Sequence, residues 1–438
     1  SLWNGDYPYH NVTAIDGTIS AGGGMEYPNV TVIGNASSAE ELEVVIVHEV
    51  GHNWFYGILG SNERVHGWMD EGLNTLNEMR YVETKYPNNK RLSDMVLNGK
   101  FHLNDLDHHD MGDVMYRMLA AFGKDQAIET HSADFSSINY GAIMYQKTGL
   151  VFYYLKDYLG TEVFDQCMQK YFNLWKFKHP QPQDLQRVFE ETTGKKLDWF
   201  FHDLIQTTDH IDYKISKVKF NKDGGVVQVK NKGKVDGPIE VNVINKDKSM
   251  NSYWVEPGQT ATSISSKKVA VDYVMIDANR DIPELNRSNN YYYPNIPFFM
   301  RKQEPLALEF FSGDNEGGKN NIFWLPIIAG NSNDRTMLGV AVHNFGLGPR
   351  PTQYLIAPMY SFGRKMVSGI AEVSHTFYPE NFFRSSKLGV SAKSFSTNGI
   401  SDNPRGAYFV GISPYLLMEF GKKKNNPSIT RTLLIKTI

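Results

Sequence analysis

Between residues 37 and 206 the apolar positions recur every three to four residues, the spacing of helices that bury one face. Helices are therefore predicted at 38–56, 70–85, 91–100, 110–122, 140–158, 162–176, 183–192 and 197–206. The first begins at Ser37 and Ser38, and Glu40 and Glu41 follow three residues later, as in a capping box. We expect this part of the chain to form a mainly helical lobe.

The segments on either side of the helical lobe have the pattern of strands. Before it, a glycine-rich stretch leads into the β-branched run Val30–Ile33, which predicts one strand. After it, residues 211–278 alternate or are β-branched, with polar clusters between the runs, which indicates a small β-sandwich. Its strands are predicted at 214–220, 225–231, 239–245 and 269–276. A linker rich in Asn, Tyr and Pro is expected at 279–300.

Residues 301–438 contain repeated segments of about ten residues in which alternate positions are apolar. Strands are predicted at 322–330, 336–345, 352–362, 366–378, 386–396, 404–420 and 428–438. Two interpretations remain open: a soluble antiparallel sheet, or a truncated, incomplete β-barrel of the outer-membrane kind, whose strands have this length and alternation. Aromatic residues near the strand ends favour the membrane, namely Trp324, Tyr354, Tyr360, Phe362, Phe377, Tyr378, Phe382 and Phe383. The region also resembles the barrel of bacterial surface-antigen proteins.

The first predicted helix carries a pair of histidines, His48 and His52, four residues apart. On a helix this spacing places both imidazoles on one face, where they can bind a single Zn²⁺. Glu49 stands beside them as a base for the water that the metal activates. Both histidines are expected in the interior of the helix.

A catalytic zinc site needs a third protein ligand, and Glu71 is the best candidate. It lies eighteen residues beyond His52, near the start of the second predicted helix. Glu78, two turns later, would point the same way and can orient a ligand imidazole from outside the ligand set. A solvated helix glutamate is the equally weighted alternative for Glu78.

A glycine-rich stretch, Gly23, Gly24, Met25 and Glu26, is a candidate substrate-binding segment. Glycines let a substrate backbone approach closely, and a carboxylate such as Glu26 can bind a cationic amine. An ordinary glycine-rich turn is the alternative.

Two tyrosines, Tyr140 and Tyr145, are candidates for a second catalytic role. A phenol can donate a hydrogen bond to an oxyanion that forms opposite a zinc ion. The chain has 24 tyrosines, so composition does not select either one. The adjacent His108 and His109 favour a polar loop or cap over a second metal site.

Composition sets the outer limits of the prediction. With 438 residues, 41% of them hydrophobic and 21% charged, the chain is globular and long enough for two or three domains. The net charge of −3 gives no reason to expect nucleic acid as a partner. The single cysteine, Cys167, excludes an internal disulfide framework. The chain begins with Ser and stops inside an alternating segment, so we expect a fragment of a longer protein.

Three motifs in this order resemble the aminopeptidase N-like family of gluzincin zinc metallopeptidases. They are the Gly-Gly-Met-Glu run, the His48–His52 pair with Glu71, and Tyr145 followed by Gln and Lys. The resemblance implies a thermolysin-like catalytic domain over residues 1–206 whose N-terminal part is missing. It further implies that His48, His52 and Glu71 bind one Zn²⁺ ion per chain.

The same resemblance implies the catalytic roles. Glu49 is then the general base and later the acid, Tyr145 stabilises the tetrahedral intermediate, and Glu26 binds the free α-amine of the substrate. The family places its catalytic tyrosine two residues before a lysine, which selects Tyr145 over Tyr140.

The sequence thus predicts a multidomain α+β protein: a thermolysin-like helical lobe, a small β-sandwich at 211–278, a linker at 279–300, and an antiparallel β-rich region at 301–438. The predicted function is a zinc aminopeptidase that acts on peptides with a free N-terminus. Its expected location is the cell envelope, either the periplasm or an outer membrane reached through 301–438. One alternative is a thermolysin-like endopeptidase, which would have no use for Glu26. Another is a non-catalytic peptide-binding envelope protein, which would need a damaged catalytic set. An epoxide-hydrolysing side activity is the third.

Overall fold

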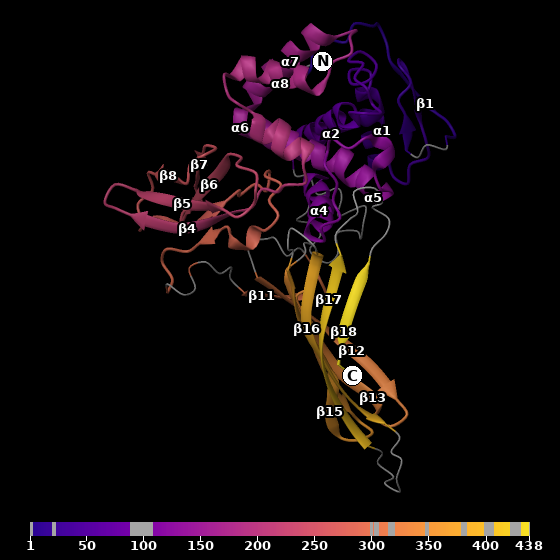
Figure 1. Ribbon diagram of the computed structural model, residues 1–438, viewed down its shortest axis with the longest axis vertical. Coiled ribbons are helices and arrows are strands. Elements are labelled where there is room, and N and C mark those ends of the chain that lie inside the picture. The colour runs from indigo at the N-terminus through magenta and orange to yellow at the C-terminus, as the bar shows by residue number, and fades with distance from the viewer. Residues whose placement is uncertain are drawn as a thin grey trace. The chain divides into compact units, whose positions relative to one another are not determined.

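The computed structural model describes residues 3–19, 23–87, 108–297, 301, 306–313, 320–346, 350–377, 383–397, 407–420 and 431–437. Its fold is mixed α+β with several separate sheets (Figure 1). The chain divides into two compact units. The first contains the described residues up to 301 except Met118–Lys124, and the second contains that segment and the described residues from 306 onward. The predicted helix 91–100, Tyr378 and Phe382 lie outside the described residues.

The first unit begins with a three-stranded sheet that leads into the histidine-bearing helix. Its elements are β1 (Thr13–Asp16), β2 (Gly24–Met25), β3 (Val30–Ile33) and α1 (Ala39–Gly51). β3 lies in the centre, parallel to β1 and antiparallel to β2. The Thr31 hydroxyl donates to the Glu49 carbonyl at 3.1 Å, and this bond holds β3 against α1. The predicted strand at 30–33 and the serine cap are confirmed, since the Ser38 hydroxyl accepts from the Glu41 amide at 3.1 Å.

The helical part of the first unit follows. Its elements are η1 (Gly67–Met69), α2 (Glu71–Lys85), α4 (His108–Ala121), η3 (Ser132–Asp134), α5 (Ser137–Asn139), the π-helix η4 (Tyr140–Lys147), α6 (Thr148–Leu159), α7 (Thr161–Trp175), α8 (Pro182–Thr193) and the π-helix η5 (Trp199–Leu204). Trp68, Leu73 and Phe152 are fully buried and form part of the core around α2 and α6. None of the described helices combines the length and the apolar character needed to cross a membrane.

Two further sheets complete the first unit. Their strands are β4 (Tyr213–Phe220), β5 (Gly225–Asn231), β6 (Ile239–Asn245), β7 (Met250–Val255), β8 (Ala261–Ile264), β9 (Val271–Ile276) and β10 (Tyr291–Tyr292). One sheet has the order β10-β9-β6-β7 and the other β4-β5-β8. The expected linker at 279–300 is in part a strand, because β10 pairs with β9, and Glu284 and Arg287 are buried beside it.

The second unit is an eight-stranded sheet in the order β11 to β18. Its strands are β11 (Leu306–Phe310), β12 (Asn320–Asn331), β13 (Arg335–His343), β14 (Thr352–Ser361), β15 (Met366–Phe377), β16 (Phe383–Thr397), β17 (Ala407–Phe420) and β18 (Thr432–Lys436). Pairing is antiparallel from β12 onward, as predicted, but β11 lies parallel to β12.

The eight-stranded sheet is open in the part of the chain that is described. β11 and β18 form its two edges, and no pairing joins them among the described residues. The interpretation of 301–438 as a barrel is therefore not supported, whereas strands β12 to β18 match the predicted segments within a few residues. The strand β11 was not predicted, because it is only five residues long.

Candidate metal centre and active site

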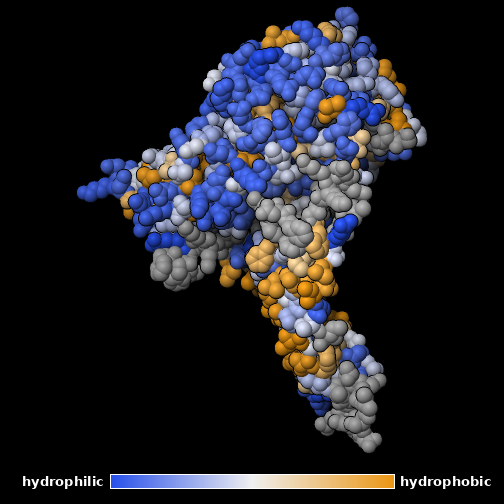
Figure 2. Space-filling model, viewed as in Figure 1, coloured by the Kyte–Doolittle hydropathy of each residue, from blue (hydrophilic) through white to orange (hydrophobic). Residues whose placement is uncertain are grey.

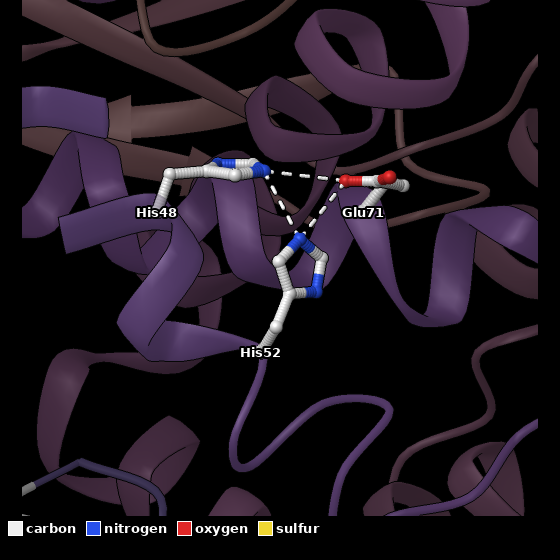
Figure 3. A group of neighbouring side chains, drawn as sticks. All are labelled: His48, His52 and Glu71. Atoms are coloured by element: carbon white, nitrogen blue, oxygen red, sulfur yellow. Dashed lines mark hydrogen bonds and ion pairs between the residues drawn. The ribbon is translucent and has the colours of Figure 1, made fainter. Parts of the chain in front are cut away.

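Three side chains of the first unit point at one another across a small gap (Figure 3). The Nε2 atoms of His48 and His52 are 3.2 Å apart, and each lies 3.2 Å from Oε2 of Glu71. A tetrahedral cation with bonds of about 2.0–2.1 Å holds its ligand atoms about 3.3–3.4 Å apart. Two imidazole nitrogens and one carboxylate oxygen in this triangle therefore fit a small tetrahedral metal ion with one position left for another ligand. The three predicted ligands are brought together by the fold.

The end of α1 differs from the prediction and explains how His52 reaches the group. The helix was expected to run to residue 56 with both histidines inside it, but it ends at Gly51, and His52 is its C-terminal cap. The Asn53 side chain donates to the Val50 carbonyl at 2.9 Å, and Tyr56 has a φ of 96°, which a helix does not allow. His52 keeps helical backbone angles, so the four-residue spacing still places both rings on the same side.

The outer nitrogen of each histidine is held by a carboxylate. Nδ1 of His48 lies 2.9 Å from Glu78, as the sequence had suggested, and Nδ1 of His52 lies 2.7 Å from Asp70. A carboxylate at Nδ1 keeps the proton there and leaves Nε2 to bind a metal. Asp70 is a functional residue that the sequence analysis missed. It precedes Glu71 in the chain, and only the packing of α2 against α1 in the folded protein reveals its partner.

His108 extends this network beyond the ligands. Its Nε2 lies 2.6 Å from Oε1 of Glu78, whose other oxygen binds His48. His108 begins α4, in keeping with the predicted polar loop or cap, and it also contacts the support of a candidate metal ligand. No signal in the sequence could have identified this contact, since thirty residues separate the two groups.

Electrostatics separate the carboxyl groups of the site into two kinds. Burial acts to raise the pKa of Glu71, but its bonds to His48 and His52 outweigh burial and hold that pKa far below its usual range. For Glu49, burial prevails and raises the pKa to about 7, although the nearby histidines act to lower it. A carboxyl group with a pKa close to neutral is well suited to accept and return a proton.

Glu49 lies against the strand that carries the glycine-rich stretch. A Cβ atom at Gly24 would come within 2.2 Å of the Glu49 carboxylate, so a larger residue at position 24 would displace the Glu49 side chain. Gly23, Gly24, Met25 and Glu26 all line the same cleft as the three candidate ligands. The negative charge of Glu26 contributes to the raised pKa of Glu49, which places the two carboxylates near each other.

Tyr145 stands on the opposite wall of the site. Its ring stacks on that of His48, with centroids 5.8 Å apart. Burial raises the pKa of Tyr145, and the Glu71 carboxylate raises it further, so the phenol keeps its proton and can donate it in a hydrogen bond. Tyr140 is adjacent, with ring centroids 5.7 Å apart, but it is more exposed. Both belong to η4, where the expected α-helix is a π-helix, a form often found at functional sites.

These residues surround a single cleft with a volume of about 590 Å³. It is lined by the glycine-rich stretch, by Val44, Val45, His48, Glu49 and His52 of α1 and its cap, by Glu63, Arg64, Gly67 and Asp70, by Glu71, Thr75 and Glu78 of α2, and by Ser132, Tyr140, Met144, Tyr145 and Gln146. Its size suits a short peptide segment or another small molecule. Every predicted site residue lines it or contacts a residue that does.

Comparisons with known proteins agree with this geometry. Residues 3–204 match the model of the peptidase family M1 domain. Aminopeptidase M1-B of Oryza sativa subsp. japonica is 24% identical over 169 residues, 38% of this chain and 18% of its own length. Glutamyl aminopeptidase of Bitis rhinoceros is 22% identical over 271 residues, 62% of this chain and 27% of its own length. Among solved structures, Legionella pneumophila aminopeptidase A in complex with aspartic acid has a TM-score of 0.47 at 12% identity, over 65% of this chain and 32% of that one.

Residues 3–204, a little under half of the chain, therefore resemble a peptidase family M1 domain. The chain spans less than a third of the length of the relatives just described.

Proposed function

We propose that this protein is a zinc-dependent aminopeptidase that removes the N-terminal residue from peptides. The observation that carries the proposal is the triangle of His48, His52 and Glu71, whose three ligand atoms are 3.2 Å apart, with Glu49 and Tyr145 beside it. Two histidines and a glutamate are a known ligand set of catalytic zinc. The carboxylates at both Nδ1 atoms support neutral, metal-binding histidines.

A zinc ion held by these three residues would polarise the peptide carbonyl and favour ionisation of a water molecule. Glu49, with its pKa near 7, accepts the proton from the attacking water and passes it to the leaving amine. The Tyr145 phenol, protonated and stacked on His48, donates a hydrogen bond to the oxygen that becomes negative. Glu26 binds the ammonium group of the substrate and so places the first peptide bond at the site.

Recognition of the free amine separates an aminopeptidase from an endopeptidase, and Glu26 is its proposed determinant. Glu26 lines the cleft and forms no hydrogen bond or ion pair with the described residues, so its carboxylate is available to a ligand. An ammonium group gains a charge-assisted hydrogen bond there, whereas an acetylated amine gains none and leaves the carboxylate unpaired.

The test compares an alanyl-arylamide with its N-acetylated counterpart on the zinc-loaded protein. We expect cleavage of the free substrate only. Glu26→Ala should raise the KM for the free substrate and narrow the difference in cleavage rate between the two substrates. The control variant Glu191→Ala, at an exposed position of α8, should leave both values unchanged. Equal cleavage of free and capped substrates by the wild type would favour the endopeptidase instead.

A specific observation on the second unit supports a proposal for its location. One face of β12 to β17 carries exposed apolar side chains, among them Ile328, Val373, Val390, Val410 and Ile412, between 47% and 77% exposed. Cross-strand pairs such as Val373–Val390 continue the face from strand to strand, and orange dominates this sheet in Figure 2. The opposite face carries Ser361, Ser368 and Ser374, all buried.

We propose that the exposed face contacts the hydrocarbon of a lipid bilayer, which would place the protein in the cell envelope. Strands of nine to fifteen residues are long enough to cross the apolar layer, which takes about 9–11 tilted residues. Flotation with vesicles of neutral lipid tests this. The protein should float, and Val390→Lys with Ile412→Lys should abolish flotation, whereas Lys387→Ala and Lys393→Ala on the other face should not. A wild-type protein that stays at the bottom of the gradient would exclude the proposal.

A further inference from the structure

The proposed active-site cleft is strongly acidic except at one position. Its lining carboxylates are Glu26, Glu49, Glu63, Asp70, Glu71 and Glu78. Of the described residues that line it, Arg64 alone is a lysine or arginine. A single cation in such surroundings is expected to pair with one of the acids, because each is a potential partner.

Arg64 forms no such pair in the part of the chain that the structure describes. The acids around the metal triangle pair with histidines instead: Glu71 with His48 and His52, Glu78 with His48, and Asp70 with His52. Glu63 is the chain neighbour of Arg64, yet no ion pair joins them. The Arg64 side chain is exposed, and its guanidinium is available to a ligand in the cleft.

The backbone that carries Arg64 is fixed although its side chain is not. The Arg64 amide donates to the Asn62 side chain at 3.2 Å, and the Arg64 carbonyl accepts from the Ser132 amide at 2.9 Å. The Ser132 hydroxyl also donates to the Glu63 carbonyl at 2.6 Å. Residues 63 and 64 are thereby held to the start of η3. A guanidinium on such a rigid support loses less conformational entropy on binding than one on a loose loop.

We propose that Arg64 binds a carboxylate group of the substrate. Arg64 thereby gives the enzyme a preference for acidic or short peptides. This inference rests on the proposed peptidase function. The guanidinium presents its donors in a planar fork that matches a carboxylate, whereas the acids of the same cleft repel one. A peptide offers this group in three places: in the side chain of its first residue, in the side chain of a later residue, or at its C-terminus.

A peptide carries ammonium and carboxylate groups, and the cleft offers a partner for each: Glu26 for the ammonium group and Arg64 for the carboxylate. Glu26 binds an ammonium group, which the surrounding acids also attract. Arg64 offsets the repulsion that those acids exert on a carboxylate. Without Arg64, a substrate carboxylate entering this cleft would meet no lysine or arginine among the described lining residues.

The experiment compares three pairs of substrates that differ by one carboxylate. They are glutamyl- and glutaminyl-arylamide, Ala-Glu-Ala-amide and Ala-Gln-Ala-amide, and Ala-Ala-Ala as free acid and as amide. For the zinc-loaded wild type we expect kcat/KM to favour the carboxylate by about 5-fold in at least one pair, as for a partly exposed ion pair. The pair that shows the preference identifies the position of the group.

Variants decide whether Arg64 is responsible. The ratio of kcat/KM for the carboxylate substrate to that for its neutral counterpart should fall to one or below in Arg64→Gln. Arg64→Lys should retain part of the preference, and added salt should reduce it. Arg187→Gln, at an exposed arginine of α8 that does not line the cleft, should leave the ratio unchanged. A wild type without preference in any pair, or a preference that survives in Arg64→Gln, would overturn the inference. Cleavage of alanyl-arylamide, which has no carboxylate, reports on the proposed function alone.

Discussion

Two clefts of nearly equal volume lie in the first unit, about 590 and 610 Å³, and both are lined by carboxylates. The second, here called the acidic cleft, is lined by Glu83 of α2, Asp157 of α6, Glu240 of β6, and Asp277 and Asp281 after β9, among others. Only the first brings together a group that can hold a metal ion, among the described residues. The composition of the two linings therefore does not decide their function.

The difference lies in what faces each carboxylate. In the acidic cleft, burial together with the neighbouring Asp157 and Asp277 raises the pKa of Asp281 to about 9. In the first cleft, bonds to His108 and His48 outweigh burial and hold the pKa of Glu78 at about 2. Carboxylates that face each other take up protons more readily, whereas Glu78, which faces two histidines, remains charged and holds the His48 imidazole. We propose that this pairing with histidines makes the first cleft a metal site.

The largest expected effect comes from the base. Glu49→Gln keeps the size of the side chain but cannot accept a proton, so we expect kcat to fall by on the order of 10²–10⁴ with zinc retained. The same change in the acidic cleft, Asp281→Asn, should leave kcat unchanged. Steady-state assays with alanyl-arylamide, together with metal analysis of both proteins, make the comparison. Full activity in Glu49→Gln would remove this residue from the mechanism.

Tyr145→Phe should have the next largest effect. Loss of one donor to an oxyanion typically reduces kcat by about 10²–10³-fold, and KM should change little because the ring remains. Tyr140→Phe is the matched variant in the same π-helix, and its effect should be much smaller. If Tyr140→Phe were the more damaging change, the assignment of the two tyrosines would have to be exchanged.

A smaller effect is expected from the support of the ligands. Glu78→Gln weakens the hold on Nδ1 of His48, and the loss of such a partner typically costs about 10–100-fold in metal affinity. Competition with a chelator of known affinity measures the change. Glu83→Gln, on the same helix but in the acidic cleft, is the control and should bind zinc as the wild type does. Equal affinities in both variants would show that Glu78 has no part in holding the site.

The smallest effect concerns stability and the acidic cleft alone. Folding raises the pKa of Asp281 from 3.8 to about 9. Its contribution to the free energy of unfolding is therefore fully present below pH 3.8 and is lost as the pH rises towards 9. Asp281→Asn should therefore raise the free energy of unfolding at pH 8 by about 1 kcal/mol, after allowance for partial exposure, and by less at pH 5. Urea unfolding at the two pH values provides the measurement. A variant that is less stable at pH 8 would contradict the raised pKa.

The sequence predicted the inner part of the site well because its spacing is local. His48 and His52 are one helical turn apart and Glu49 directly follows His48, so the helical spacing alone places them, even though the helix ends earlier than expected. Glu71 was predicted because a catalytic zinc needs a third ligand and this glutamate opens the next helix, whereas Tyr145 was selected over Tyr140 only through the family resemblance. Asp70 and His108 could not be found, since their partners depend on how α2 packs against α1 and how α4 lies against α2.

In the β-rich parts, too, the sequence predicted local elements but not the contacts between them. Alternation predicted β4, β5, β6 and the strands from β12 to β18 to within a few residues, and strands such as β4, β5 and β14 do have one face that is more buried than the other. It did not predict that β11 is parallel, that β10 joins β9, or that the sheet of the second unit is open, since strand pairing is a property of the whole fold.

The central claim is that histidine–carboxylate pairing makes the first cleft a zinc site, and metal content tests it most directly. Elemental analysis of the purified protein should give one zinc per chain. Glu71→Ala should lose it, and Asp281→Ala, the matched loss of a carboxylate in the acidic cleft, should keep it. Absence of zinc from the wild type, or equal zinc content in both variants, would contradict the account.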